Sequence, residues 1–150
     1  MNDSTSYQLV FDVARTGYRH WLFSAAGLPI AVAGFLELVR ANATRRRLGL
    51  VLVLAGVAWT SFAFLTSYHE YTSLRDALAT GRFQIVEGPV QHVVPGDGRT
   101  PESFDVRGHR YTYSWSVVSA GFNSPGIVQP GRTVRIADVG GQIARLEISR

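Results

Sequence analysis

Two long apolar stretches dominate the hydrophobic pattern of the chain. Residues 21–39 contain one charged side chain, Glu37, and residues 48–65 contain none. At about 1.5 Å per residue, each stretch would form a helix roughly 27–28 Å long, close to the ~30 Å hydrocarbon core of a bilayer. Glu37 lies one turn from Arg40, so the two can pair near the membrane interface. The pattern predicts two transmembrane helices.

Two other interpretations of these stretches are weaker. Two buried helices of a soluble protein would have to be covered on every side, and the rest of the chain is too short for that. A cleaved signal peptide is indicated by Ala31 and Ala33, which flank Val32 in an A-x-A pattern. The twenty preceding residues contain Asp3 and Asp12 and have a helical pattern of their own, so the membrane interpretation is preferred.

Residues 1–20 are predicted to form an interfacial helix that leads into the first span. Thr5 followed by Gln8 matches a capping box. The larger apolar residues recur at helical spacing, at Tyr7, Val10, Phe11, Ala14 and Tyr18.

Residues 40–47 connect the two spans and contain no acid. Their four arginines are Arg40, Arg45, Arg46 and Arg47. The positive-inside rule puts this turn in the cytoplasm and both termini on the outer side. Every one of the 15 lysine-plus-arginine positions is arginine, which indicates a GC-rich bacterial genome. We therefore expect a multi-pass protein of the bacterial inner membrane, in contact with lipid, with its termini on the periplasmic or outer side.

Small residues recur along both spans at intervals of seven. The ones we expect at a helix–helix interface are Gly27, Gly34, Gly49, Gly56 and Ala63. Such a stripe lets two helix backbones approach closely. The spacing predicts a hairpin that packs on itself, with docking against another membrane protein as the alternative.

The pattern changes from helical to alternating after the second span. Residues 66–81 form a predicted helical linker, with Gly81 as its C-cap. Residues 82–150 then alternate apolar and polar positions, which predicts a β-domain. Across Gly88 and Pro89 we expect either one long bent strand or two short ones.

Two hairpins are predicted within this domain. The first turns at Gly108 and His109, and the second turns at Gly140 and Gly141. About five short strands suit a small antiparallel barrel, with an OB-like topology as one candidate. The expected fold class is an α+β membrane protein: a two-helix transmembrane hairpin followed by a small barrel-like β-domain.

Three large aromatics, Tyr111, Tyr113 and Trp115, share one face of the first hairpin. They could form a stacking platform for sugars or bases, but at strand spacing a place in the core is the preferred interpretation.

Composition excludes several classes of function. Residues 1–65 hold six arginines and three acids, whereas residues 66–150 hold nine arginines and eight acids. The basicity is therefore a local cluster, and the nearly neutral β-domain does not predict a nucleic-acid partner. The absence of cysteine excludes disulfides, thiol catalysis and cysteine-bound zinc.

No motif in the chain predicts catalysis. Residues 121–126, GFNSPG, miss the G-x-S-x-G elbow by one position. His69 and Glu70 are adjacent but lack the HExxH spacing of a zinc site. We expect no enzyme activity, no catalytic residue, no cofactor and no metal.

The connection over residues 119–130 is long enough to carry a binding element. We expect Phe122 and Asn123 on it to lie near Glu102, Ser103 and Phe104, and these five residues form the candidate interaction surface. Plain packing of the loop is the alternative.

A set of positions in the β-domain matches a known pattern. The positions are Gly88, Val90, Glu102-Ser103-Phe104, Val106, Gly108, Tyr113-Ser114, Phe122-Asn123, Gly131, Val134-Arg135-Ile136 and Arg145-Leu146-Glu147-Ile148. On these, residues 82–148 resemble the C-terminal β-domain of a family of uncharacterised small bacterial membrane proteins. The chain departs from that family at Trp115, where an acid is common, and at Gly126-Ile127, where a double glycine is common. The resemblance implies a β-domain and no activity.

These observations favour a non-catalytic interaction or accessory module that serves another envelope or membrane protein. One alternative is a membrane-tethered ligand sensor or immunity-like protein, which would have a pocket lined by Phe104, Tyr113 and Phe122. The other is a cytoplasmic OB-like nucleic-acid binder with inverted topology.

Overall fold

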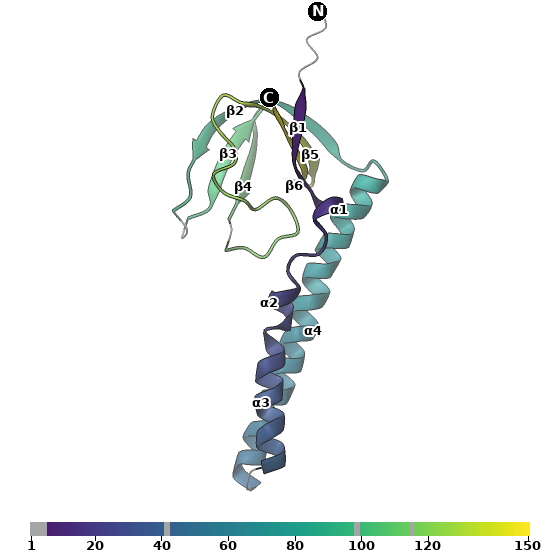
Figure 1. Ribbon diagram of the computed structural model, residues 1–150, viewed down its shortest axis with the longest axis vertical. Coiled ribbons are helices and arrows are strands. Elements are labelled where there is room, and N and C mark those ends of the chain that lie inside the picture. Colours follow the sequence, from purple (N-terminus) through teal and green to yellow (C-terminus); the bar gives the residue numbers. More distant parts are fainter. Residues whose placement is uncertain (1–5, 41–42, 98–99, 115) are drawn as a thin grey trace, which may run out of the picture. The chain divides into compact units, whose positions relative to one another are not determined.

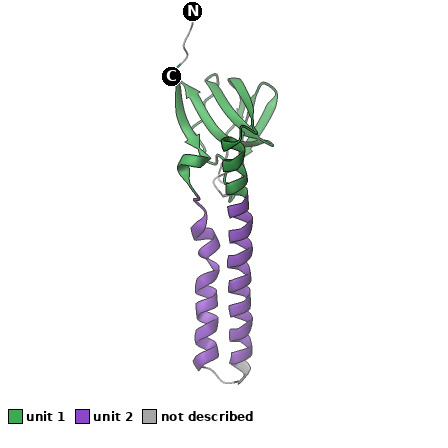
Figure 2. Ribbon diagram, turned by 90° about the vertical axis from the view of Figure 1, so that its right-hand side faces the viewer, with its two compact units in different colours: residues 1–17, 70–150 green, residues 18–69 purple. Residues whose placement is uncertain are grey.

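The computed structural model describes residues 6–40, 43–97, 100–114 and 116–150 (Figure 1). These residues fall into two compact units, coloured separately in Figure 2. Unit 1 contains the chain up to Gly17 together with Glu70–Arg150, and unit 2 contains Tyr18–His69. The first unit is therefore built from both ends of the chain.

Unit 2 consists of helices. They are α2 (Trp21–Ala25), α3 (Gly27–Arg40) and the greater part of α4 (Ala43–Ala79). Two helical segments, Trp21–Arg40 and Arg45–Ala79, are long and apolar enough to cross a membrane. The first is interrupted at Ala26, which puts Pro29 in the first turn of α3. Proline is tolerated there because the amide groups of a first turn have no partner within the helix.

Helix α4 is longer than the sequence pattern predicts. The span at 48–65 and the linker at 66–81 form one helix that ends at Ala79, and Gly81 (φ 71°) follows it in the expected left-handed conformation. The arginine-rich turn is correspondingly shorter than 40–47. Arg40 ends α3, and Arg45, Arg46 and Arg47 lie in the first turns of α4, because nothing in their sequence prevents helix formation.

Glycines bring the helices of unit 2 into backbone contact. Gly27 lies against Gly56, and Gly34 lies against Gly49. A methyl group on Gly34 would come within 2.7 Å of the carbonyl oxygen of Gly49, so no larger residue fits without separating the helices. Ala63 is also buried. The small residues at intervals of seven thus form the interface within the hairpin.

The described part of unit 1 contains a six-stranded antiparallel sheet with the order β1-β6-β5-β2-β3-β4. Its strands are β1 (Tyr7–Asp12), β2 (Gln84–Val94), β3 (Glu102–Val106), β4 (His109–Tyr113), β5 (Thr133–Val139) and β6 (Gln142–Ser149). The α+β class is confirmed, but the sheet is not closed, unlike a complete version of the expected small barrel. A barrel needs every strand paired on both sides, whereas β4 ends at Tyr113 and the chain leaves the sheet there, so β1 and β4 remain its edges.

Strand β1 corrects the prediction of a helix over residues 1–20. Tyr7–Asp12 pairs with β6, with Phe11 opposite Leu146, and among the described residues before Gly17 only α1 (Val13–Thr16) is helical. The aromatic and β-branched residues of this segment fit a strand as well as a helical face, and the partner strand that decides between them lies at the other end of the chain. The capping-box residue Thr5 lies outside the described residues.

Strand β2 is a single bent strand, which settles the alternatives across Gly88 and Pro89. Its first half pairs with β5 and its second half pairs with β3. Near its end the register shifts, and His92 has a φ of 46°, a conformation that favours glycine.

Both predicted hairpins are present. The β3–β4 turn is at Arg107 and Gly108, one residue earlier than expected, and the β5–β6 turn is at Gly140 and Gly141. All four residues have positive φ, as two-residue hairpin turns of type I′ require.

The core of unit 1 is formed mainly by residues of the sheet. It includes Val90, Phe104, Val106, Tyr111, Val134, Ile136 and Leu146, together with Leu74 from the last turns of α4. Tyr111 and Tyr113 are buried as expected, whereas Trp115 lies outside the described residues.

Candidate functional site

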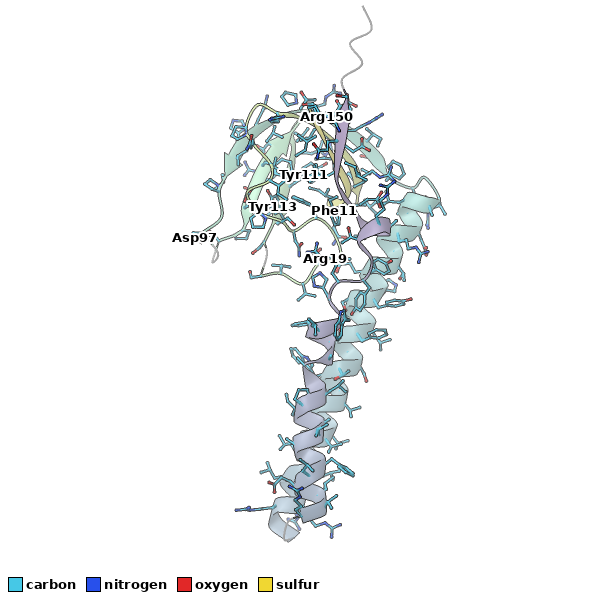
Figure 3. The ribbon with its side chains drawn as sticks, viewed as in Figure 1. Phe11, Arg19, Asp97, Tyr111, Tyr113 and Arg150 are labelled. Atoms are coloured by element: carbon cyan, nitrogen blue, oxygen red, sulfur yellow. The ribbon has the colours of Figure 1, made fainter. Side chains whose placement is uncertain are left out.

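A cavity of about 300 Å³ opens into unit 1 at the end of β4. Tyr111 and Tyr113 line it, and Figure 3 shows both residues among the strands of unit 1. The other lining residues are Glu70, Pro101, Thr112, Ser114, Val117, Val118, Ser119, Gly121, Phe122, Asn123, Gly141, Gln142 and Ile143. Glu70 comes from α4, Pro101 precedes β3, and Gly141 lies in the β5–β6 turn. The others come from β4 with Ser114 after it, from the start of β6, and from the loop over residues 116–132, here called the long loop.

Two tyrosines form one wall of the cavity. They are two residues apart on β4, so their side chains point to the same face of the sheet. The Tyr111 hydroxyl donates to Asp138 Oδ2 at 2.8 Å, and the Tyr113 hydroxyl donates to Glu102 Oε1. Burial, and then the carboxylate beside it, raises the pKa of each hydroxyl far above its usual value of 10. Both hydroxyls therefore remain hydrogen-bond donors at physiological pH.

The same two carboxylates also bind glycine amides in loops. The Gly141 N–H donates to Asp138 Oδ1 at 2.7 Å, and the Gly126 N–H donates to Glu102 Oε2 at 3.0 Å. Both carboxylates are buried, and each joins a tyrosine of β4 to a separate loop. Among the described residues, no buried side-chain polar atom lacks a partner. These acids therefore serve as structural anchors.

Glu70 is the one charged residue among the described residues that line the cavity. Its Oε1 accepts hydrogen bonds from Ser119 Oγ at 3.0 Å and from Gln142 Nε2 at 2.8 Å. Both donors are neutral side chains, so neither supplies a positive counter-charge to the carboxylate.

The long loop is held to the sheet at several points. Phe122 is 5% exposed, and its ring centroid lies 5.0 Å from that of Tyr113 and 5.7 Å from that of Phe11. The Phe122 N–H donates to the Ile143 carbonyl at 3.0 Å. With the bonds to Gly126 and Ser119, these contacts fix the loop as one wall of the cavity.

The structure divides the five residues of the candidate interaction surface. Glu102 and Phe122 both contact Tyr113, and Asn123 lines the cavity. Phe104 is buried in the core, and Ser103 points to the opposite face of β3 because side chains alternate along a strand. Their role in an interaction stays a prediction, but Glu102, Phe104 and Phe122 lie too deep to contact a partner directly.

Sequence reasoning missed the contributions of Glu70, Asp138 and Gln142. In the sequence, Glu70 stands out only by its position next to His69, which is a possible metal-binding pair without the spacing of a zinc site. No local spacing connects these residues, since Glu70 and Gln142 are 72 positions apart. Within the described ranges, no group of three or more histidines and acids could hold a metal ion.

Ion pairs surround Asp105 on the outer face of the β3–β4 hairpin. Arg110 Nε lies 2.8 Å from Asp105 Oδ1, and His92 Nδ1 lies 3.2 Å from Oδ2. The hydrogen bond from Arg110, assisted by the charges of Arg110 and His92, holds the pKa of Asp105 below its ordinary value of 3.8. This cluster faces solvent and does not line the cavity.

Asp105→Asn is expected to make the free energy of unfolding fall less steeply as the pH becomes acidic. Because the folded-state pKa of Asp105 is lowered, its carboxylate stabilises the fold above its unfolded-state pKa, and this contribution disappears as pH falls through the folded-state pKa. Urea unfolding measured between about pH 5 and pH 2 checks this. Arg110→Gln should reduce the same acid dependence of the free energy of unfolding. The double variant should reduce it little further than either single variant. A wild-type slope in Asp105→Asn would contradict the assignment.

No protein-family model, curated protein or solved structure matches this chain. The resemblance of residues 82–148 to a bacterial β-domain therefore stays a prediction, and the functional conclusions rest on the geometry of the chain itself.

Proposed function

We propose that this protein is an integral membrane protein of the bacterial inner membrane whose β-domain acts, outside the cytoplasm, as a non-catalytic accessory module for another envelope protein. The observation that carries this proposal is the long loop, which is fixed in place beside the cavity while Val117 and Ile127 on it stay exposed, at 53% and 40%. A preorganised apolar surface loses little conformational entropy when a partner binds. An OB-like relationship of the domain stays a prediction.

The surfaces of the unit 2 helices support a lipid environment. Large apolar side chains point outward along both, including Leu22 at 65%, Phe35 at 60% and Phe62 at 71% exposed. Soluble monomers rarely expose continuous apolar surfaces of this extent, because water around them is unfavourable. Lipid acyl chains would remove that cost.

The pairing of β1 with β6 supports two membrane crossings. Strand β1 precedes the apolar helices and β6 follows them, yet the two strands are hydrogen-bonded neighbours. Both must therefore be in the same compartment, which requires an even number of crossings between them. Two transmembrane helices satisfy this condition.

The arginines between the helices support the orientation. Arg40 lies at the end of α3, and Arg45, Arg46 and Arg47 lie near the start of α4. By the positive-inside rule this end faces the cytoplasm, which puts the β-domain on the outer side. A periplasmic reporter enzyme fused after Arg150 should be active, and activity of a cytoplasmic reporter at that position would refute the orientation.

Photo-crosslinking in living cells tests the accessory role. A photoreactive phenylalanine analogue at Val117 or Ile127 is expected to attach to the same envelope protein. Ile85 is the matched control, because it is an exposed apolar residue (51%) that does not line the cavity. If the two loop positions yield no common adduct, or if Ile85 yields the same adduct, the proposed surface is wrong.

A membrane-tethered ligand sensor is the second candidate function, and the cavity specifically favours it. Tyr113 and Phe122 line the cavity, as that alternative requires, whereas Phe104 lies beside them in the core. A concave site that combines aromatic walls with a few polar groups is typical of small-molecule binding.

A further inference from the structure

We propose that the cavity binds a small organic ammonium ion with an apolar body, and that Glu70 holds its cationic group. This inference rests on the second candidate function, the tethered ligand sensor, and names the class of ligand. It can fail separately from the first candidate, because Ile127 of the exposed surface does not line the cavity, although Val117 belongs to both.

The charge of the cavity selects a cation. Glu70 is its one charged lining residue within the described part of the chain. The hydrogen bonds from Ser119 and Gln142 both reach Oε1. Neither of these bonds uses Oε2, which can accept an ammonium N–H, and the neutral donors hold the carboxylate in position for it.

The tyrosine hydroxyls make the cavity a poor site for an anion. An anion needs hydrogen-bond donors, but the hydroxyl protons of Tyr111 and Tyr113 are already donated to Asp138 and Glu102. Those two carboxylates also add negative charge behind the wall. The arrangement therefore disfavours carboxylate and phosphate ligands.

The remaining walls fit an apolar body. The rings of Tyr111, Tyr113 and Phe122 line the cavity together with aliphatic side chains such as Val118 and Ile143. Aromatic faces attract cations as well as apolar groups. A volume of about 300 Å³ is at the lower end of the range for small-molecule sites, so the ligand must be small.

Titration calorimetry on the full-length protein in detergent micelles tests the proposal with three matched probes. They are 2-phenylethylammonium, the neutral 2-phenylethanol and the anionic phenylacetate. Saturable binding is expected for the ammonium ion, with weaker binding of the alcohol and weakest binding of the acid. Glu70→Gln should weaken binding of the ammonium ion by roughly 10- to 100-fold, the range for a charge-assisted hydrogen bond, and leave the alcohol unchanged.

A second pair of variants distinguishes binding of the probes in the cavity from their uptake into the detergent micelle. Val117→Trp should block the cavity and abolish binding of all three probes. Val94→Trp is the matched control, because Val94 is equally exposed (52% against 53%) but does not line the cavity. Binding that survives Val117→Trp, equal affinity for the ammonium ion and the acid, or no saturable binding would each overturn the proposal. None of these outcomes would change the crosslinking result at Ile127, which does not line the cavity. Failure of the ligand proposal can therefore be distinguished from failure of the proposed accessory role.

Discussion

Glu102→Ala is expected to lower the free energy of unfolding of the β-domain by about 3 kcal/mol, since it removes the charged acceptor of the buried Tyr113 hydroxyl and of the Gly126 amide. The Tyr113 hydroxyl and the Gly126 amide both bond this carboxylate, which is 5% exposed. The Tyr113 side chain is buried, so its hydroxyl would lose its acceptor inside the domain. Urea unfolding of the full chain in micelles, followed by near-ultraviolet circular dichroism, measures the change.

The neighbouring Ser103→Ala is the control for this prediction. Ser103 is only partly buried and points to the other face of β3, so its substitution should change the free energy of unfolding by less than about 0.5 kcal/mol. Tyr113→Phe should also destabilise the domain, and the double variant with Glu102→Ala should cost less than the two single changes together. Additive effects would show that the hydroxyl and the carboxylate do not interact.

Gly56→Leu is expected to destabilise the helical hairpin of unit 2 by about 3 kcal/mol, the upper end of the range for overpacking. A Cβ at this position would lie 2.6 Å from the backbone nitrogen of Ala31, and backbone atoms cannot move aside as a flexible side chain can. The helices must separate or rotate, and both changes lose contacts along the whole glycine interface. Unfolding of the purified protein by dodecyl sulfate, monitored by far-ultraviolet circular dichroism, measures the effect.

Ala55→Leu is the matched control for Gly56→Leu. Ala55 is the preceding residue on α4, but it is exposed, so the same leucine there meets no helix. It should leave the dodecyl sulfate midpoint unchanged. If Gly56→Leu is tolerated equally well, the close packing of Gly56 on Gly27 and Ala31 is wrong.

The elements with strong local patterns could be predicted from the sequence. The helices at 21–39 and 48–65 are predominantly apolar, with Glu37 as their one charged residue, and the hairpin turns contain glycine where positive φ is needed, at Gly108, Gly140 and Gly141. The buried positions of Tyr111 and Tyr113 followed from their alternation on one strand. Each of these features is decided by residues that are close together in the chain.

The candidate site could be predicted only in part. Phe122 and Glu102 were expected near each other and do meet through Tyr113, but as an interior anchor and not as an exposed surface. Glu70 was not expected at all, because its donors Ser119 and Gln142 are 49 and 72 positions away. A carboxylate acquires such a role only when the fold has brought its partners together.

The sequence by itself determined which segments are apolar helices, where the β-hairpins turn and which small residues let the helices of unit 2 touch, since periodicity and glycine positions are local properties. The tertiary structure alone decided that residues 7–12 form a strand and that the sheet stays open. It also decided which acids are buried and which one lines the cavity. The pattern of residues 7–12 fits either a strand or a helical face. The strand forms because β6, more than 130 residues further along the chain, supplies its hydrogen-bond partners.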